Sequence, residues 1–501
     1  MYDFNKRATL HELNTLSMLG LDSHLTTEER NRLRKVAQYW DFYEGFHWED
    51  ITDLGERPQI TENYCRAFVN KFNAFEFGNG FTIKATVEDN KADTPITNFI
   101  NEVWKSNKKE TLCLEFGQTK SVTGMGCFQV VFEKPGKFDD PFEEYPKGRI
   151  RIVNIPRHIV FPHYDSHDKD KLTEVMIAYP IEVEEKSPIL RTVNKKQVLY
   201  KQIWTKDVVI IEDGRNAPVK IKNPYGIIPF VFVANYPLAG RPVTEAQSDL
   251  EDLIPLNIEL NTKTSDVSEI IDYYSAPITI LYGAKVSSLE KGANKLWGGL
   301  PTDARVQNLE LQGDLGASNS YRRDLKSAMH EIGGVPEGAL GGQQSISNTS
   351  SVALHIANSP IIERIRTKRG YSSLGIQQVN KLILYIALQN KLITKPETMS
   401  NKDFYTTEVT FPDVLPKDRL IELQQIQTEM SLGLEYRKKA MERLGKEDIN
   451  DYIQNIDKDV EENPEFYGRQ PKEDPQLNSG MLNGQTPIEQ VRKEVTSKNG
   501  E

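Results

Sequence analysis

Three histidines near the middle of the chain are the first residues whose chemistry suggests a metal site. His158, His163 and His167 lie close together in the sequence, with Asp165 and Asp168 beside them. Imidazole nitrogens and carboxylates are common metal ligands. These side chains, however, fall in a polar loop at the ends of predicted strands, where titratable surface histidines are the ordinary case. We therefore expect no bound metal there.

A second group of candidate ligands is acidic. Asp249, Glu251 and Asp252 resemble the carboxylate cluster of a two-metal nuclease, so a metal-dependent DNA-processing enzyme is the alternative hypothesis for the function. Neighbouring carboxylates on one helix point around its axis, whereas metal chelation requires ligands that converge from several elements. We therefore expect no catalytic residue, no metal ion and no cofactor, and we predict that the protein is not an enzyme.

Sequence motifs of common enzymes are missing. The chain contains no GxxxxGK(S/T) phosphate-binding loop, so we do not expect it to be the ATP-driven motor of a molecular machine. The HExxH, GxSxG and GxGxxG motifs are also absent. The motif search therefore points to no reaction class.

The composition is that of a hydrophilic globular protein. The 501 residues are 38% hydrophobic and 27% charged, with a mean hydropathy of -0.53. The net charge of -10 argues against a conventional nucleic-acid binder that neutralises phosphates with a basic domain. Cys65, Cys113 and Cys127 have no CxxC spacing, which fits buried thiols in a reducing compartment rather than disulfides or a zinc ribbon.

Nothing in the sequence predicts export or membrane insertion. The N-terminal stretch MYDFNKRATLHELNT lacks the apolar run of a secretory signal. The most apolar stretch, residues 382–388, is far shorter than the roughly 20 residues of a membrane span. We expect a soluble protein that is made in the cytoplasm and has no membrane contact.

The hydrophobic patterns predict a mixed α+β fold. Residues 1–125 have helical periodicity, with a capping box at Thr26 and Glu29. A second helix in this region carries Tyr64 and the phenylalanines that follow it, and it stops at Gly78. Residues 127–235 contain β-branched and aromatic runs separated by polar turns, which indicates strands.

One long helical segment is predicted at 243–275, and its charge is lopsided. Pro255 predicts a kink or a restart within it. Like charges three or four residues apart repel one another along a helix, so we infer that something outside this helix favours acidic side chains. Against the single base Lys263, the segment carries eight acids: Glu245, Asp249, Glu251, Asp252, Glu259, Asp266, Glu269 and Asp272.

The rest of the chain alternates between breaks and helices. Residues 276–312 form short pieces, and a helix follows from 318 to about 332. The stretch 333–351 is rich in small and hydroxyl residues, and 352–392 is a basic helical segment interrupted by Pro360. Further predictions are a strand at 407–411, helices at about 417–432, 435–444 and 446–460, and a disordered tail at 463–501.

Several stretches follow one another in an order that is typical of one family. They are YWDFYEGFHW at 39–48, RPQITENYCRAFVNKFNAFEFGNGFTI at 57–83, NPYGIIPFVFVAN at 223–235, SDLEDLIPLNIELNTKTSDVSEIIDYYSAP at 248–277 and RKKAMERLGKEDINDYIQNIDKD at 437–459. Together they resemble the portal proteins of tailed double-stranded DNA bacteriophages over nearly the whole chain. The strongest match is 248–277, an acidic helix that leads to an apolar exit.

The resemblance implies a portal fold in which long kinked helices surround a central channel. It also implies a ring of about twelve identical subunits at one capsid vertex, through which the genome enters and leaves. Carried over by segment, it assigns a wing to 1–241, a stem helix to 243–275, a clip to 276–315, a second stem helix to 316–332, a tunnel loop to 333–351, a long wing helix and closing strand to 352–415, crown-like helices to 416–462 and a tail to 463–501.

The resemblance further implies partners and a location. The expected partners are other copies of the chain, the terminase large subunit, head-tail adaptor proteins, the major capsid and scaffold proteins, and double-stranded DNA that passes without sequence specificity. The mature protein is expected in the virion, after assembly in the host cytoplasm.

Under this hypothesis, acidic side chains of the stem line the channel. A negative wall repels phosphates, so DNA slides instead of binding. The opposite charges of this helix and of the basic helix after Pro360 are predicted to help adjacent subunits register. The predicted lining residues are Asp252, Glu259, Asp266 and Glu269.

Two further groups of residues are predicted to touch DNA or a partner. A flexible loop that contacts DNA and a docking point in the clip are expected, with an ordinary surface loop and a buried core tryptophan as the alternatives. The loop residues are Gly341, Gly342, Gln343, Gln344, Ser345, Ser347 and Asn348, and the docking residues are Leu296 and Trp297.

Overall fold

The computed structural model describes residues 9–48, 58–85, 94–135, 145–186, 193–275, 279–283, 301–308, 315–341, 356–397, 399–414, 419–444 and 449–462. The chain divides into two compact units, Met1–Leu415 and Pro416–Glu501. Helices and antiparallel sheets occur together in the first unit, which confirms the predicted α+β class.

Several helices of the first unit begin at a side-chain cap. Thr26 and Glu29 form the predicted capping box, in which each side chain accepts the backbone N–H of the other residue. Asn63 caps the next helix by accepting the N–H of Arg66 at 2.8 Å. In chain order the helices are α1 (Leu10–Met18), α2 (Thr27–Glu44), α3 (Tyr64–Phe77), α4 (Thr94–Ser106), α5 (Lys109–Thr123), α6 (Leu253–Ser275), α7 (Leu315–Gly333), α9 (Ser359–Gln389) and α10 (Asn401–Phe404).

The described strands pair only in antiparallel fashion. The largest sheet has the order β4-β5-β6-β7-β8, a second has the order β3-β2-β9, and β1 pairs with β12 and β10 with β11. The strands are β1 (Thr82–Ala85), β2 (Met125–Glu133), β3 (Arg149–Asn154), β4 (Val160–Asp165), β5 (Asp168–Lys186), β6 (Val193–Thr205), β7 (Val208–Glu212), β8 (Val219–Lys222), β9 (Phe230–Ala234), β10 (Thr279–Tyr282), β11 (Arg305–Asn308) and β12 (Thr407–Thr410).

Helix α9 takes part in two hydrophobic cores of the first unit. Towards its C-terminus, Ile383 is fully buried in a core that also contains Trp104 of α4. Near its N-terminus, Ile361 is fully buried in a second core together with Leu260 of α6 and Met329 of α7. Burial of these side chains on both sides makes α9 the element that joins α6 and α7 to the sheets.

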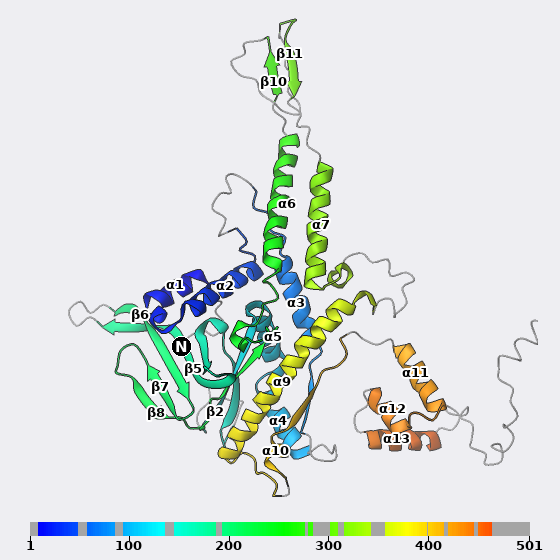
Figure 1. Ribbon diagram of the computed structural model, residues 1–501. Coiled ribbons are helices and arrows are strands. Elements are labelled where there is room, and N and C mark those ends of the chain that lie inside the picture. Colours follow the sequence, from blue (N-terminus) through cyan, green and yellow to red (C-terminus); the bar gives the residue numbers. More distant parts are fainter. Residues whose placement is uncertain are drawn as a thin grey trace, which may run out of the picture. The chain divides into compact units, whose positions relative to one another are not determined.

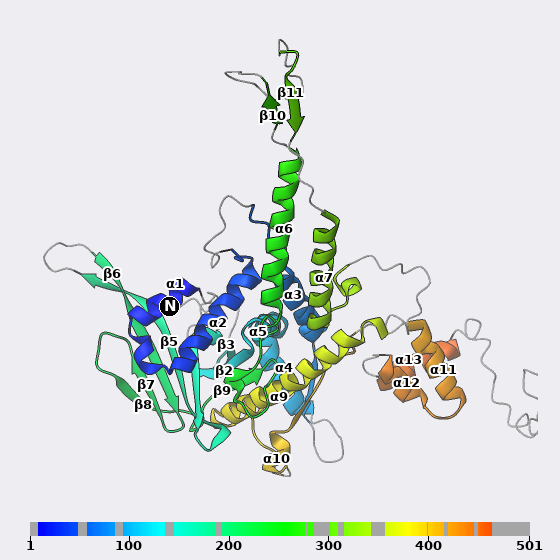
Figure 2. The same ribbon diagram turned by 45° about the horizontal axis from the view of Figure 1, so that its top comes forward.

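Helices α6 and α7, together called the α6–α7 pair, lie side by side in both views of the molecule (Figure 1, Figure 2). The chain leaves α6, passes through the β10–β11 hairpin and returns into α7. The second helix agrees closely with the predicted 318–332. These two helices are the elements on which the predicted acidic surface depends.

The predicted helix at 243–275 is too long at its N-terminal end. Helix α6 begins at Leu253, and the residues before it form a short 3-10 turn at Val243–Glu245 and irregular turns. Pro255 lies in the first turn of α6, where its missing N–H has no intrahelical partner to lose, so it marks the start of the helix and not the kink or restart predicted within a longer one. Pro360 occupies a similar position at the start of α9. Residues 356–357 are helical and Asn358 forms a turn before α9, so the predicted interruption of this helical segment is confirmed.

The described residues of the second unit form three helices, as the sequence predicts. They are α11 (Arg419–Ser431), α12 (Arg437–Arg443) and α13 (Ile449–Glu462). In neither unit do the described residues include a helix with the length and apolar character needed to span a membrane.

Candidate functional site

Three of the four predicted channel acids share one side of α6. Glu259, Asp266 and Glu269, here called the acidic stripe, are spaced by seven and three residues, which places them on one helix face. Glu269 is exposed, and the side chains of Glu259 and Asp266 retain 40% and 29% exposure. The stripe is therefore a solvent-facing surface of the α6–α7 pair.

The acidic stripe carries one counter-charge from its own helix. The ammonium of Lys263 lies 3.1 Å from Asp266 Oδ2 and 3.9 Å from Glu259 Oε1. Its hydrogen bond to Asp266 raises the pKa of Lys263, so the group remains charged at neutral pH. Lys263 thus offsets part of the charge of Glu259 and Asp266, which makes the stripe less negative than the count of acids along 243–275 predicts.

Asp252, the fourth predicted lining residue, does not belong to the acidic stripe. It lies in the turn before α6, where the side-chain amide of Gln247 donates to its carboxylate at 2.9 Å. Two neighbouring acids also point to separate partners. Glu251 pairs with Lys35 at 2.9 Å, whereas Asp249 is buried and bound by cations of α9. Placing these acids on one helix was wrong, because the chain is not helical there.

The residues behind the nuclease alternative are likewise dispersed. Asp249, Glu251 and Asp252 bind different partners instead of converging, and His158 is buried whereas His167 is exposed. Among the residues described by the structure, no three His, Cys, Asp or Glu side chains are grouped so that they could hold a metal ion. This geometry gives the metal-dependent reaction no support.

The buried histidine makes a testable contribution to stability. Burial lowers the pKa of His158 to about 3, so the native state excludes a proton that the unfolded chain binds below about pH 6.5. The free energy of unfolding therefore rises with pH between about pH 3 and about pH 6.5, and this contribution is lost as the pH falls through that window. Between pH 7.5 and pH 5.5 we expect His158 to remove about 1.4 kcal/mol from the free energy of unfolding.

Urea unfolding of the wild type and of His158→Gln at both pH values measures this loss. The variant should lack that part of the pH dependence, and His167→Gln, at an exposed position, should retain it. Comparing single variants is necessary because burial also lowers the pKa of His47, whereas the hydrogen bond that His163 donates to Glu29 raises the pKa of His163. An unchanged pH dependence in His158→Gln would contradict the prediction.

An extended segment before α3, residues 58–63, is hydrogen-bonded along α6 and is here called the strap. Three short polar side chains of α6, four residues apart and buried, bind its backbone. Ser265 Oγ accepts the Ile60 N–H at 3.2 Å, and Asn261 Oδ1 accepts the Glu62 N–H at 2.9 Å. Asn257 Nδ2 donates to the Glu62 carbonyl at 2.8 Å. These bonds satisfy strap backbone groups that have no sheet partner.

The side chain of Glu62 ties the strap to both helices of the α6–α7 pair. Arg322 of α7 donates to Glu62 Oε1 at 2.8 Å and to Thr264 Oγ1 of α6 at 2.9 Å. Thr264 itself donates to Glu62 Oε1 at 2.7 Å. Sequence analysis missed this arrangement, although the spacing of the short polar residues on α6 by four was a visible signal.

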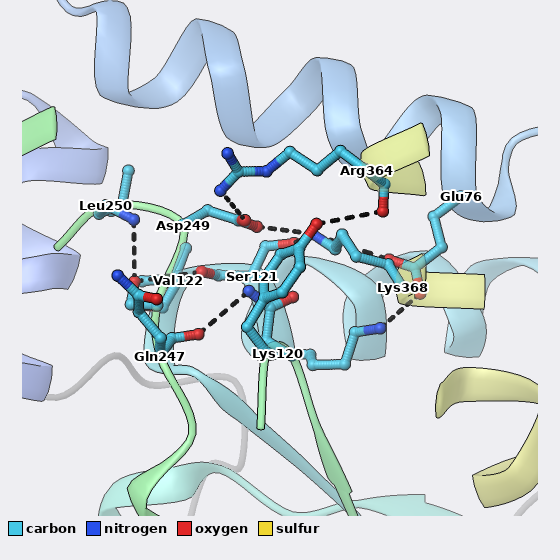
Figure 3. A network of polar contacts seen from close by, with 12 residues as sticks. Glu76, Lys120, Ser121, Val122, Gln247, Asp249, Leu250, Arg364 and Lys368 are labelled. Atoms are coloured by element: carbon cyan, nitrogen blue, oxygen red, sulfur yellow. Dashed lines mark hydrogen bonds and ion pairs between the residues drawn. The ribbon is translucent and has the colours of Figure 1, made fainter. Parts of the chain in front are cut away.

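A group of charged side chains lies beneath the α6–α7 pair, and Figure 3 shows it from close by. Lys368 donates to Asp249 Oδ2 at 2.5 Å and to Ser121 Oγ at 2.7 Å, and Lys120 donates to Glu76. We call this set the buried charge cluster, and it comes from α3, α5, α9 and the turn before α6. Its members are Glu76, Lys120, Asp249, Arg364 and Lys368.

The charges of the buried charge cluster depend on one another. Burial alone would raise the pKa of Asp249, but the cations of Lys368 and Arg364 outweigh this effect and lower it. The carboxylate therefore stays ionised in the interior. Because an ionised group without a partner is costly in a medium of low polarity, the cluster fixes the turn before α6 against α9.

The cations of α9 have a different role from the predicted one. Arg364 and Lys368 bind Asp249 of the same chain, and Arg369 donates to the Phe75 carbonyl at 2.6 Å. These three groups are thus occupied within the subunit, whereas Arg366 on the same helix is exposed. The prediction that the basic residues of this helix help adjacent subunits to register was therefore wrong for Arg364, Lys368 and Arg369.

Most of the predicted loop and docking residues lie outside the described part of the chain. Gly341 is described and adopts a φ of 94°, a left-handed conformation that suits glycine. The other loop residues, Gly342, Gln343, Gln344, Ser345, Ser347 and Asn348, and the docking residues Leu296 and Trp297, fall outside it.

Comparison with known proteins identifies the family. No curated protein matches the chain significantly. The family described as "Phage portal protein, SPP1 Gp6-like" matches residues 22–465, which include the acidic stripe, the strap and the buried charge cluster. The resemblance inferred from the sequence is confirmed, and the chain belongs to the phage portal proteins, structural proteins of the bacteriophage capsid vertex that take part in DNA packaging.

Proposed function

We propose that identical copies of this chain close into a ring, of about twelve subunits, whose central channel conducts double-stranded DNA during packaging and ejection. The observation that carries the proposal is the acidic stripe on an exposed face of α6, in a chain of the portal family. In such a ring, the α6–α7 pair is the stem and the stripe faces the channel.

The proposed regions follow the elements of the chain. The wing comprises 1–241 together with α9 and β12, and the clip comprises 276–315 with the β10–β11 hairpin. The crown comprises 416–462, and 333–351 is the tunnel loop. The stem begins at Leu253 in this assignment, because helix α6 begins there.

Electrostatic repulsion accounts for movement of DNA through the proposed channel. A stripe with three carboxylates and one ammonium per subunit surrounds the lumen with negative potential when it is repeated around a ring. The potential decays over about 8 Å at physiological ionic strength, so it acts on DNA only in a close-fitting bore. DNA therefore does not bind the wall and release its counterions, and the duplex slides without sequence specificity.

The proposed partners dock at the clip end of the ring and around its rim. The terminase large subunit and head-tail adaptor proteins bind the clip, with Leu296 and Trp297 as candidate contacts. The major capsid and scaffold proteins surround the ring at the vertex. Assembly takes place in the host cytoplasm, and the mature ring belongs to the virion.

Electron microscopy and native mass spectrometry of the purified full-length chain test the ring. We expect closed rings with a central hole and a mass of about twelve times the subunit mass of 57.1 kDa. A protein that stays monomeric at every salt concentration would rule out the proposal. A second test adds plasmid DNA and divalent metal to the same sample, and metal-dependent cleavage would favour the nuclease alternative.

A further inference from the structure

One arginine of α9 contacts the chain at the base of both helices of the α6–α7 pair. Arg364 Nη1 donates to the carbonyl of Gly333 at 3.1 Å and to that of Ile332 at 3.4 Å, where α7 ends. Its Nη2 donates to Asp249 Oδ1 at 3.0 Å, a few residues before α6 begins. A single planar group therefore binds two segments at one point, the end of α7 and the turn before α6.

Aromatic rings hold the guanidinium of Arg364 in place. Its central carbon lies 4.9 Å from the centre of the Phe72 ring and 5.1 Å from that of the Tyr236 ring. The hydroxyl of Tyr236 also donates to the Arg364 carbonyl at 3.1 Å. Stacking on two rings restricts the orientation of the guanidinium, so its donors remain directed at both targets.

The contact with α7 matches the chemistry of a helix C-terminus. The last carbonyls of a helix have no intrahelical donor and carry a partial negative charge, so a cation beside them is favourable. Arg364 supplies that cation while its other nitrogen binds a fully buried carboxylate. Moving α7 relative to α9 would break the bonds to the carbonyls of Ile332 and Gly333. Moving the start of α6 would break the bond to Asp249.

We propose that Arg364 is a positioning residue that fixes the angle between the α6–α7 pair and α9. If the proposed function is correct, this angle sets the width of the bore between the acidic stripes of the ring. The two terminal nitrogens of the Arg364 guanidinium are essential to this role. A lysine has a single nitrogen and cannot reach both the end of α7 and Asp249 along fixed directions.

The neighbouring lysine separates positioning from folding. Lys368 lies one helical turn after Arg364 and binds the other oxygen of Asp249 at 2.5 Å. In Arg364→Lys, the buried carboxylate therefore keeps a charged partner, and the variant is expected to fold. Arg366→Lys is the matched control, because Arg366 is exposed on the same helix.

Pulsed electron paramagnetic resonance measures the distance between two spin labels, and this distance depends on the angle between the helices. Spin labels are attached to Ser320→Cys on α7 and Gln378→Cys on α9, both exposed positions, in the full-length chain. The native cysteines are all buried, so labelling favours the two introduced thiols. Mixing the labelled protein with about a tenfold excess of unlabelled protein before assembly isolates distances within one chain.

We expect one narrow distance distribution in the parent and in the Arg366→Lys control, and at least a doubling of its width in Arg364→Lys. An unchanged distribution in Arg364→Lys would overturn the proposal. If this variant does not fold, Arg364→Gln is measured in the same way, with the same expected and contradicting results.

Failure of both variants to fold would also overturn the proposal, because Arg364 would then be needed for the fold and not for an angle. The measurement uses no DNA and no packaging reaction. A chain that does not form rings can therefore still confirm or contradict the role of Arg364, and the two proposals fail separately.

Discussion

Replacing Glu259, Asp266 and Glu269 together by lysine is expected to reduce DNA packaging by at least about tenfold while rings still form. The reason is that ammonium groups on the stripe neutralise phosphates and release their counterions, so DNA binds the channel wall instead of sliding. The three side chains are solvent-facing, and none belongs to the buried charge cluster. Packaged DNA per assembled particle is the quantity to measure, with ring formation checked by electron microscopy.

The matched control places the same change of charge elsewhere. Glu102, Glu110 and Glu115 are exposed on α4 and α5, and their triple lysine variant should package DNA like the wild type. Raising the salt concentration should partly relieve the defect of the stripe variant, because salt weakens phosphate binding. Packaging within about twofold of the wild type, in rings with the stripe reversed, would contradict the electrostatic role of the stripe.

Replacing Lys368 by methionine is expected to lower the free energy of unfolding by about 3–5 kcal/mol. The substitution removes the closest cation from Asp249, whose side chain is fully buried, and leaves Glu76 with Lys120 as its charged partner. Asp249 then keeps only Arg364, whose side chain is partly exposed, so part of the desolvation energy of this buried carboxylate is no longer compensated. Urea unfolding of the full-length chain, followed by tryptophan fluorescence, measures the change in the first unit, because all five tryptophans of the chain belong to that unit.

Two further variants identify the cause of that loss. Lys381→Met changes an exposed lysine of the same helix and should leave the urea midpoint unchanged. Adding Asp249→Leu to Lys368→Met removes the incompletely compensated buried charge and should recover at least part of the stability, because Arg364 retains access to solvent. A loss below about 1 kcal/mol in Lys368→Met would show that the buried pair is not needed.

Local signals in the sequence located many of the elements. The capping box of Thr26 and Glu29 lies where it was predicted, and the aromatic stripe that begins at Tyr64 forms α3. Such signals work because hydrogen bonds and side-chain contacts within one helical turn involve residues only three or four positions apart. The family was also recognisable, since its motifs are continuous stretches of sequence.

The start of α6 shows where local reasoning fails. The apolar spacing of Leu250, Leu253 and Ile254 continues the helical pattern into the turn before Leu253. Ser248 instead donates to the carbonyl of Val122 at 2.6 Å, and Asp249 is drawn into the interior by α9. These partners lie more than a hundred residues away in the sequence, and no local pattern reports them.

The sequence by itself determined the α+β class, the family, and the spacing that aligns Glu259, Asp266 and Glu269 on one helix face. Only the tertiary structure decided that Asp249 is a buried ion-pair partner and Asp252 a turn residue, although both are acids of one short stretch. The physical reason is that helix periodicity is set by neighbouring residues, whereas the state of a charge depends on which distant segments exclude water from it and which cations they bring within reach.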